Sequence, residues 1–215
     1  EGIVFADKCQ PPGGPLTPRY RKYLESRGFD PDWIALEYGV LAAGPSCRWY
    51  GEDRDWRGSD FSDRLIVPLK DKTGRVIAFQ GRTIREDEVI RWRFPPLDRV
   101  AGHYKETLYG AHSGLGDTVA VVEGVMDKWK LGRGSVASYG TSLSGAQVRM
   151  LGGFHRVVML FDSEPEAQAR ARMYARDIAA LGAMVQVVDL ELPLGPSGKA
   201  LDLGDLGAGD VQAIR

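Results

Sequence analysis

The sequence has few of the residues that build cross-linked or zinc-binding folds. Its 215 residues include two cysteines, Cys9 and Cys47, which are far apart in the chain, and three histidines. This composition excludes a disulfide framework and a cysteine-rich zinc site within these residues. No apolar run approaches the roughly 20 residues that a membrane-spanning helix needs, and no charged-then-apolar leader opens the chain. We therefore expect a cytoplasmic protein without a membrane partner.

The chain also lacks an excess of charge of one sign. Lys and Arg total 28 against 29 Asp and Glu, which gives a formal net charge of −1. Binding to nucleic acid would therefore need a local basic patch. One candidate patch lies between residues 61 and 105. This stretch contains 10 Lys or Arg residues and 6 Asp or Glu residues, and aromatic residues are interleaved with the basic ones. Such a stretch suits a single-stranded template and a nucleoside triphosphate.

The first half of the chain predicts a small α+β lobe. After an irregular lead-in over residues 1–15, the pairs Thr17-Pro18 and Asp30-Pro31 each predict a short helix, because an N-cap residue followed by proline starts a helix. Two β-type runs at 64–69 and 75–79 are joined by a short turn that ends in glycine. They predict an antiparallel hairpin.

The second half predicts an α/β lobe. Short apolar runs alternate with helix-length segments, and the runs are 119–122, 135–138, 156–161 and 184–188. Strands that alternate with helices predict a mainly parallel sheet flanked by helices. We therefore expect an α/β chain with an N-terminal lobe over residues 16–115 and a parallel-sheet lobe over residues 116–215.

Acidic residues follow three of these predicted strands. Because the carboxyl ends of parallel strands meet at one edge of a sheet, the carboxylates would repel one another unless cations lie between them. Oxygen ligands without Cys or His favour Mg²⁺ or Mn²⁺ over zinc. Capping of the next helix explains any single acidic residue equally well. Acidic residues after three strands of the same sheet, which we call the acidic corners, favour a metal site. The acids are Glu123, Asp127, Asp162, Glu164, Asp202 and Asp205.

Four motifs of this second half resemble the Toprim domain, a metal-binding fold shared by DnaG-type primases, topoisomerases and some nucleases. They are VVEGVMD (121–127), ASYGTSLSGAQVRML (137–151), VVMLFDSE (157–164) and GKALDLGDL (198–206). The resemblance implies that Glu123, Asp162 and Glu164 are catalytic metal ligands and that Asp127, Asp202 and Asp205 are auxiliary ligands. Glu164 departs from the family pattern, which usually has aspartate at this position.

The first half is similar to the primase catalytic core that precedes Toprim in DnaG-type enzymes, without the zinc-binding module that usually comes before it. The segments are RYRKYLESRGFDPDWIALEYGVL (19–41), DRLIVPLKDKTGRVIAFQGRTI (63–84) and YKETLYG (104–110). The resemblance implies metal-dependent synthesis of short RNA primers from ribonucleoside triphosphates on single-stranded DNA in phage or mobile-element replication, with a replicative helicase or a separate zinc-binding module as further partner. The basic residues implied to hold template or nucleotide are Arg64, Arg82, Arg91, Arg93 and Lys105.

Other interpretations remain open at this point. Any single arginine of the predicted hairpin could equally well be a residue on the solvent-exposed face of the sheet without a role in binding nucleic acid. The same acids would serve a Toprim nuclease that uses water as its nucleophile. Glu164 and the missing zinc module are also compatible with a non-catalytic domain that binds nucleic acid.

Overall fold

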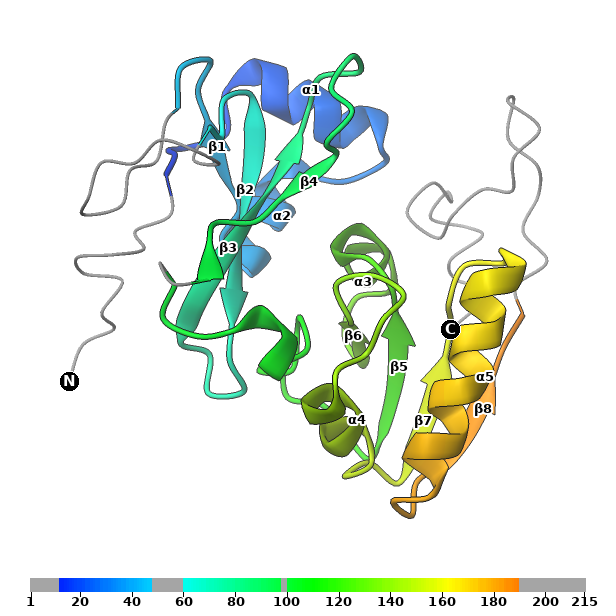
Figure 1. Ribbon diagram of the computed structural model, residues 1–215. Helices are drawn as coiled ribbons and strands as arrows, with labels where there is room; N and C mark the ends of the chain where they lie inside the picture. Colours follow the sequence, from blue (N-terminus) through cyan, green and yellow to red (C-terminus); the bar gives the residue numbers. More distant parts are fainter. Residues whose placement is uncertain (1–11, 48–59, 98–99, 190–215) are drawn as a thin grey trace. The chain divides into compact units, whose positions relative to one another are not determined.

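The computed structural model describes residues 12–47, 60–97 and 100–189, and the chain divides into two compact units (Figure 1). The first unit comprises Glu1–Lys70 and Arg75–Tyr104, and the second comprises Asp71–Gly74 and Lys105–Arg215. In the part of the chain that the structure describes, no helix is long and apolar enough to cross a membrane.

Two short helices open the described part of the first unit. Helix α1 (Pro18–Ser26) follows Thr17, and α2 (Pro31–Tyr38) follows Asp30, whose carboxylate accepts the backbone N–H groups of Asp32 and Trp33. Both predicted helix starts are confirmed. Proline suits the first helical position because the backbone N–H that it lacks would have no acceptor within the helix. The helices bury Leu24 and Ile34 completely.

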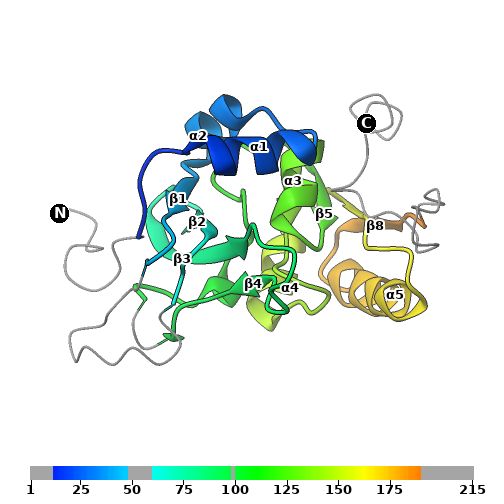
Figure 2. The ribbon, with the colours of Figure 1, turned by 90° about the horizontal axis from the view of Figure 1, so that it is seen from above.

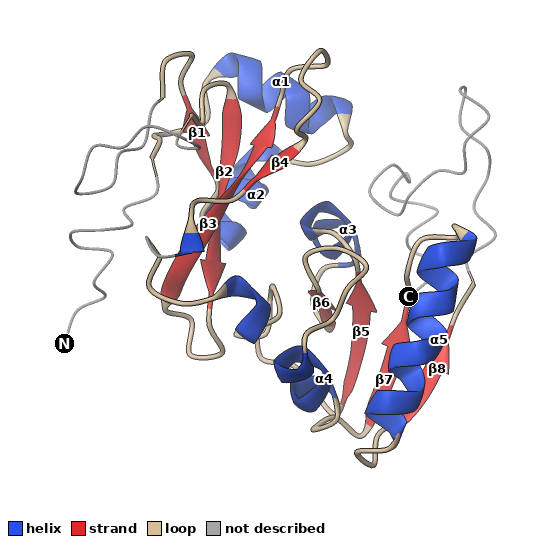
Figure 3. Ribbon diagram, in the orientation of Figure 1, coloured by secondary structure: helices blue, strands red, loops and turns tan. Residues whose placement is uncertain are grey.

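The first unit also contains a four-stranded antiparallel sheet with the order β1-β2-β3-β4 (Figure 3). The predicted hairpin is its centre. Phe61 and Phe79 pack together on this sheet with a ring-centroid distance of 5.0 Å, and with Ala43 and Ile66 they form a buried cluster. The strands are β1 (Leu41–Ala43), β2 (Arg64–Lys70), β3 (Val76–Thr83) and β4 (Trp92–Arg93).

The second unit is built on a four-stranded parallel sheet with the order β6-β5-β7-β8, which confirms the predicted fold class. Helix α3 covers one face of this sheet, and α4 and α5 cover the other (Figure 2). The elements are β5 (Thr118–Val122), α3 (Val125–Leu131), β6 (Ser135–Ala137), α4 (Gly145–Leu151), β7 (Arg156–Met159), α5 (Pro165–Ala179) and β8 (Met184–Val187).

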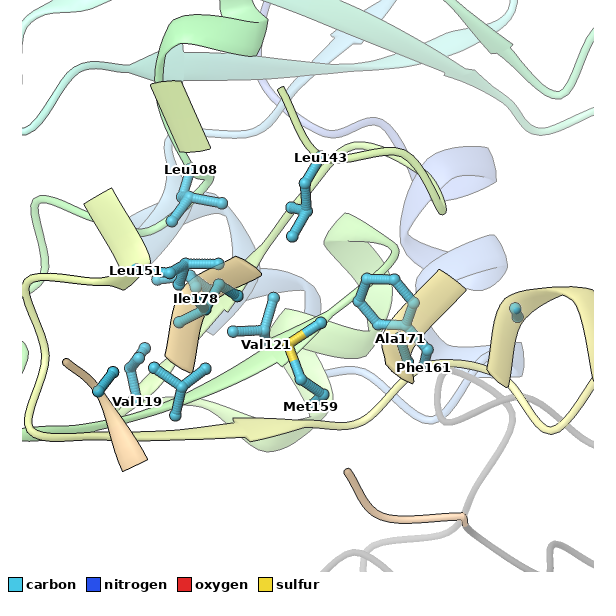
Figure 4. Packing of buried hydrophobic residues seen from close by; sticks show 13 residues of the cluster. Leu108, Val119, Val121, Leu143, Leu151, Met159, Phe161, Ala171 and Ile178 are labelled. Carbon is cyan, nitrogen blue, oxygen red and sulfur yellow. The ribbon is translucent and has the colours of Figure 1, made fainter. Parts of the chain in front are cut away.

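The core of the second unit lies between the sheet and α4 and α5. Val121 and Met159 of the sheet pack with Leu151 and Ile178 of these helices (Figure 4). Leu108 belongs to the same cluster, and Tyr109 pairs with Ala137 at the end of β6. The boundary between the units therefore falls at residues 104/105, about ten residues before the boundary near 115 that the sequence pattern favoured.

Gly81 in β3 fills a position with no room for a side chain. A Cβ atom there would lie 2.7 Å from Cδ1 of Phe61 and 3.0 Å from Cδ of Arg64, and both of these side chains are buried. We expect Gly81→Ala to lower the free energy of unfolding by about 1–3 kcal/mol, as overpacking does. Urea unfolding of the variant measures this loss. Gly44→Ala is the control, because among the described residues, apart from Gly44 and its two chain neighbours, no atom lies within 4 Å of the place that its new methyl group would occupy. An equal loss in both variants would contradict the packing argument.

Candidate functional site

The acidic corners after β5 and β7 meet at the carboxyl edge of the parallel sheet. The two strands are direct neighbours and run in the same direction, so Glu123 and Asp162 leave the sheet side by side. The backbone N–H of Asp162 donates a hydrogen bond of 3.0 Å to Oε1 of Glu123. This bond joins the two corners that the sequence predicted to share a site.

The environment of Glu123 disfavours its charged form. Its side chain is buried, and its pKa is raised from 4.5 to about 7, with burial as the largest cause. The charges of Asp162 and, more weakly, Glu164 contribute to this rise, while the hydrogen bond from Asp162 and the charge of Arg170 oppose it. The three predicted catalytic acids therefore share one electrostatic environment, in which the charge of Arg170 offsets part of their negative charge.

Asp127 serves the fold at this corner. Its Oδ2 accepts the N–H of Gly124 at 2.9 Å and so caps the first turn of α3. A Cβ atom on residue 124 would lie 2.6 Å from that oxygen, so the glycine is required for this close approach. The capping interpretation of the sequence therefore holds for Asp127, and its predicted role as an auxiliary metal ligand stays a prediction.

The remaining acids differ in their surroundings. Asp162 is half-buried, whereas Glu164 is exposed at the N-cap position of α5 and its side chain makes no capping hydrogen bond. Among the residues that the structure describes, no group of three or more His, Cys, Asp or Glu side chains is arranged to hold one metal ion. Asp202 and Asp205 lie outside the described residues.

Lys105 holds the loop that follows β6. Its ammonium group donates to the carbonyl oxygens of Ser138, Tyr139 and Ser142 at 3.0, 3.0 and 2.7 Å. Burial lowers the pKa of this lysine. Tyr139 has a φ of 61°, a left-handed conformation that costs energy in a residue other than glycine. Lys105 thus stabilises a strained loop at the sheet edge, a role that the basic-patch pattern did not suggest.

Arg64 is directed into the first unit. Its side chain is 3% exposed, and it donates to the carbonyl oxygens of Gly81 and Ile90 at 3.2 and 2.9 Å. Glu88 lies 3.5 Å from the same guanidinium. Burial lowers the pKa of Arg64, and the neighbouring charge of Arg93 lowers it further. The guanidinium ties β2 to the segment before β4, and contact with nucleic acid would require these bonds to break.

The other predicted basic residues are more accessible. Arg82 lies opposite Trp92 in the sheet, with its guanidinium 5.4 Å from the ring centroid, and its Nε donates to the hydroxyl of Tyr23 at 3.2 Å. Arg91 is exposed and Arg93 is half-buried, on or beside the edge strand β4. An arginine beside an aromatic ring is a combination that proteins use to bind unpaired bases.

Sequence reasoning missed two residues of α5. Arg170 donates to the hydroxyl of Thr141 and lines, with Glu164, a cavity of about 410 Å³ beside the acidic corner. Gln168 is buried under the loop that carries Asp162. The motif ended at residue 164, and both side chains lie within the next two turns of the helix. A signal was present for Gln168, since a polar residue between Ala167 and Ala171 on the buried helix face needs a hydrogen-bond partner.

Comparisons with known proteins agree with this architecture. Residues 50–112 match the model of the DNA primase catalytic core, N-terminal domain. The DNA primase of Deinococcus radiodurans is 34% identical in an alignment 193 residues long that covers 84% of this chain. That of Synechococcus elongatus is 33% identical in an alignment 187 residues long that covers 80%. The chain belongs to the DnaG-type family of primase catalytic cores.

Solved primase structures share the fold of this primase core. A DnaG primase catalytic domain bound to single-stranded DNA superposes with a TM-score of 0.71 at 23% identity, covering 92% of this chain and 72% of the other. The zinc-binding and RNA polymerase domains of the Aquifex aeolicus primase superpose with a TM-score of 0.70 at 22% identity, covering 92% and 55%. The primase core spans 31% and 25% of the Deinococcus and Synechococcus proteins, less than a third of either length.

The raised pKa of Glu123 makes the stability of the metal-free primase core depend on pH. Between pH 4.5 and about 7 the folded state holds a proton that the unfolded state has released, so the free energy of unfolding falls as pH rises through this window. We expect Glu123→Gln, which cannot ionise, to be more stable than the wild type at about pH 8, by up to about 3 kcal/mol, with a gap that narrows towards acid pH. Urea unfolding in the presence of a chelator gives the free energy of unfolding of both proteins at each pH. A difference between them that does not depend on pH would contradict the raised pKa of Glu123.

Proposed function

We propose that this chain is the catalytic core of a primase that synthesises short RNA primers on single-stranded DNA, and that its second unit is a Toprim domain. The observation that carries the proposal is the meeting of Glu123 and Asp162 at the carboxyl edge of the parallel sheet. Ligands of open α/β sheets bind at this edge. Membership of the primase family supports the reaction, which is a nucleotidyl transfer. The phage or mobile-element setting stays a prediction.

The chemistry of the acids suits a divalent cation, although the described side chains are not arranged around one point. Their oxygens are the ligands that Mg²⁺ and Mn²⁺ prefer. Burial and, after it, the negative charges of Asp162 and Glu164 raise the pKa of Glu123, so the charged form of this acid lacks a compensating partner. We expect Glu123, Asp162 and Glu164 to hold the ion. When bound, such an ion lowers the pKa of the attacking 3′-hydroxyl and offsets the charge of the triphosphate. The exposed position of Glu164 leaves room for the extra methylene that distinguishes it from aspartate.

The basic residues would hold the other reactants. Arg82 with Trp92, and the exposed Arg91, provide cations and an aromatic ring on one sheet of the first unit. Such groups bind phosphates and stack with bases. In the second unit, Arg170 offers a guanidinium beside Glu164 that suits the phosphates of a nucleotide.

The first test removes the charge of Glu123. We expect Glu123→Gln to lower the rate of primer synthesis by on the order of 100-fold or more, because the cation loses a negatively charged ligand, while affinity for single-stranded DNA is unchanged. Incorporation of labelled ribonucleotides with Mg²⁺ or Mn²⁺ measures synthesis, and fluorescence anisotropy measures binding. Asp117→Asn is the control, since Asp117 directly precedes β5 and so lies at the opposite edge of the sheet.

Each outcome of this experiment distinguishes the candidate functions. Full synthesis by Glu123→Gln would remove Glu123 from the catalytic residues. Metal-dependent cleavage of DNA by the wild type, without ribonucleotide incorporation, would favour the Toprim nuclease. DNA binding with neither activity would favour a non-catalytic domain.

The second test concerns the first unit. If Arg82 contacts a phosphate, Arg82→Ala should weaken single-stranded DNA binding similarly for different template sequences. The slope of log affinity against log salt should become shallower by about 1, because one counterion fewer is released. Arg21→Ala is the control, since the guanidinium of Arg21 on α1 donates to Asp32 through two bonds of 2.8 and 2.6 Å. An unchanged slope in Arg82→Ala would refute the template contact.

A further inference from the structure

Gln168 ties the acidic loop after β7 to helix α5. Its side chain is 2% exposed. The side-chain amide Nε2 donates to the carbonyl oxygens of Phe161 and Asp162 at 3.0 and 3.1 Å. Its own backbone N–H donates to the carbonyl oxygen of Glu164 at 3.0 Å. One residue therefore contacts the backbone of both predicted metal-binding positions of this loop and of the residue before them.

The amide satisfies carbonyl groups that the sheet cannot pair. Strand β7 ends at Met159, so the carbonyls of residues 161 and 162 lie beyond its ladder. Buried carbonyls need a donor. Gln168 supplies this donor from helix α5. The side chain of Phe161, which is 1% exposed, is fixed in the hydrophobic core (Figure 4).

Both backbone polar groups of Asp162 are thereby held by side chains. Its N–H donates to Glu123 and its carbonyl accepts from Gln168. With the peptide groups on both sides fixed, the direction of the Cα–Cβ bond of Asp162 is fixed as well. The carboxylate can then vary only through its own side-chain rotations.

The orientation of the amide follows from its surroundings. A flipped amide would place Oε1 against two carbonyl oxygens, which repel it, so Nε2 must face the loop. In this orientation Oε1 is buried and, among the described residues, has no hydrogen-bond partner. Leaving a buried acceptor unpaired is costly, and an apolar side chain of similar shape would avoid that cost. The two donated bonds are what distinguish glutamine from such a side chain here.

We propose that Gln168 is a positioning residue, which fixes the backbone of Asp162 so that its carboxylate is pre-oriented for a divalent cation. The inference rests on the proposed function for the identity of the cation. Neutral side chains that orient metal ligands commonly contribute 10-fold to 100-fold to metal affinity. Gln168 acts through Asp162, since its own side chain is buried.

The test compares two buried glutamines. Gln168→Met keeps the length of the side chain and removes the donor, and Gln168→Glu keeps its shape but places a carboxylate against the two carbonyls. Gln147→Met is the control, because the amide of Gln147 is also fully buried and donates to two carbonyls, those of Thr107 and Ser138, at 2.8 and 3.2 Å. Mn²⁺ affinity is measured by calorimetry at equal distances below the melting temperature of each protein.

We expect both Gln168 variants to bind Mn²⁺ about 10-fold more weakly or worse than the wild type, and Gln147→Met to bind it normally. In primer synthesis, the Mn²⁺ concentration for half-maximal rate should rise by a similar factor in the Gln168 variants, with recovery at saturating Mn²⁺. Should Gln168→Met fail to fold, Gln168→Glu carries the comparison, and if neither folds, Gln168 is essential to the fold and the positioning role is rejected.

Three results would overturn the inference. They are unchanged Mn²⁺ affinity in the Gln168 variants, an equal loss in Gln147→Met, and no Mn²⁺ binding by the wild type. Failure of the proposed function is a separate result. In that case the wild type makes no primers, while Mn²⁺ affinity still depends on Gln168.

Discussion

The second unit is organised around like charge concentrated at one edge of a parallel sheet. Strands β5 and β7 are neighbours and deliver Glu123 and Asp162 to the same place. Glu164 follows two residues later, and its charge also acts on Glu123. Burial and these neighbours move the pKa of Glu123 close to neutrality. The site is consequently one in which a bound cation would relieve an energetic cost that the fold itself imposes.

The two helices and the central hairpin of the first unit were predictable because each depends on local sequence, whereas the short strands β1 and β4 were not predicted. The proline starts of α1 and α2 and the glycine turn between β2 and β3 are short-range signals. The alternation of apolar runs and helical segments defined the parallel sheet, and its carboxyl edge then located Glu123 and Asp162. The boundary between the units was harder, because Leu108 belongs to the second core through contacts with residues far along the chain.

The roles of individual charged residues were less predictable, since residue type does not reveal the partner. Arg64 and Arg82 stand in one basic stretch, yet Arg64 donates to backbone carbonyls of its own unit while Arg82 lies over Trp92. From the sequence, Lys105 was predicted to bind phosphate like the arginines of this stretch. In the structure it holds the strained loop at Tyr139. Alternation along a strand gives the face of each side chain, but the segment that crosses that face comes from elsewhere in the chain.

Uncharged hydrogen-bond donors hold the acidic corners in place, and such donors leave the negative charge of the acids uncompensated. The N–H of Asp162 anchors Glu123, the N–H of Gly124 anchors Asp127, and the amide of Gln168 anchors the loop of Asp162. Lysine or arginine in these anchoring positions would cancel the negative charge of the edge and lower the pKa of Glu123. Backbone and amide groups fix the geometry but leave the charge in place. The fold thereby separates two tasks, because the position of the acids is set by hydrogen bonds and their charge is left for a cation.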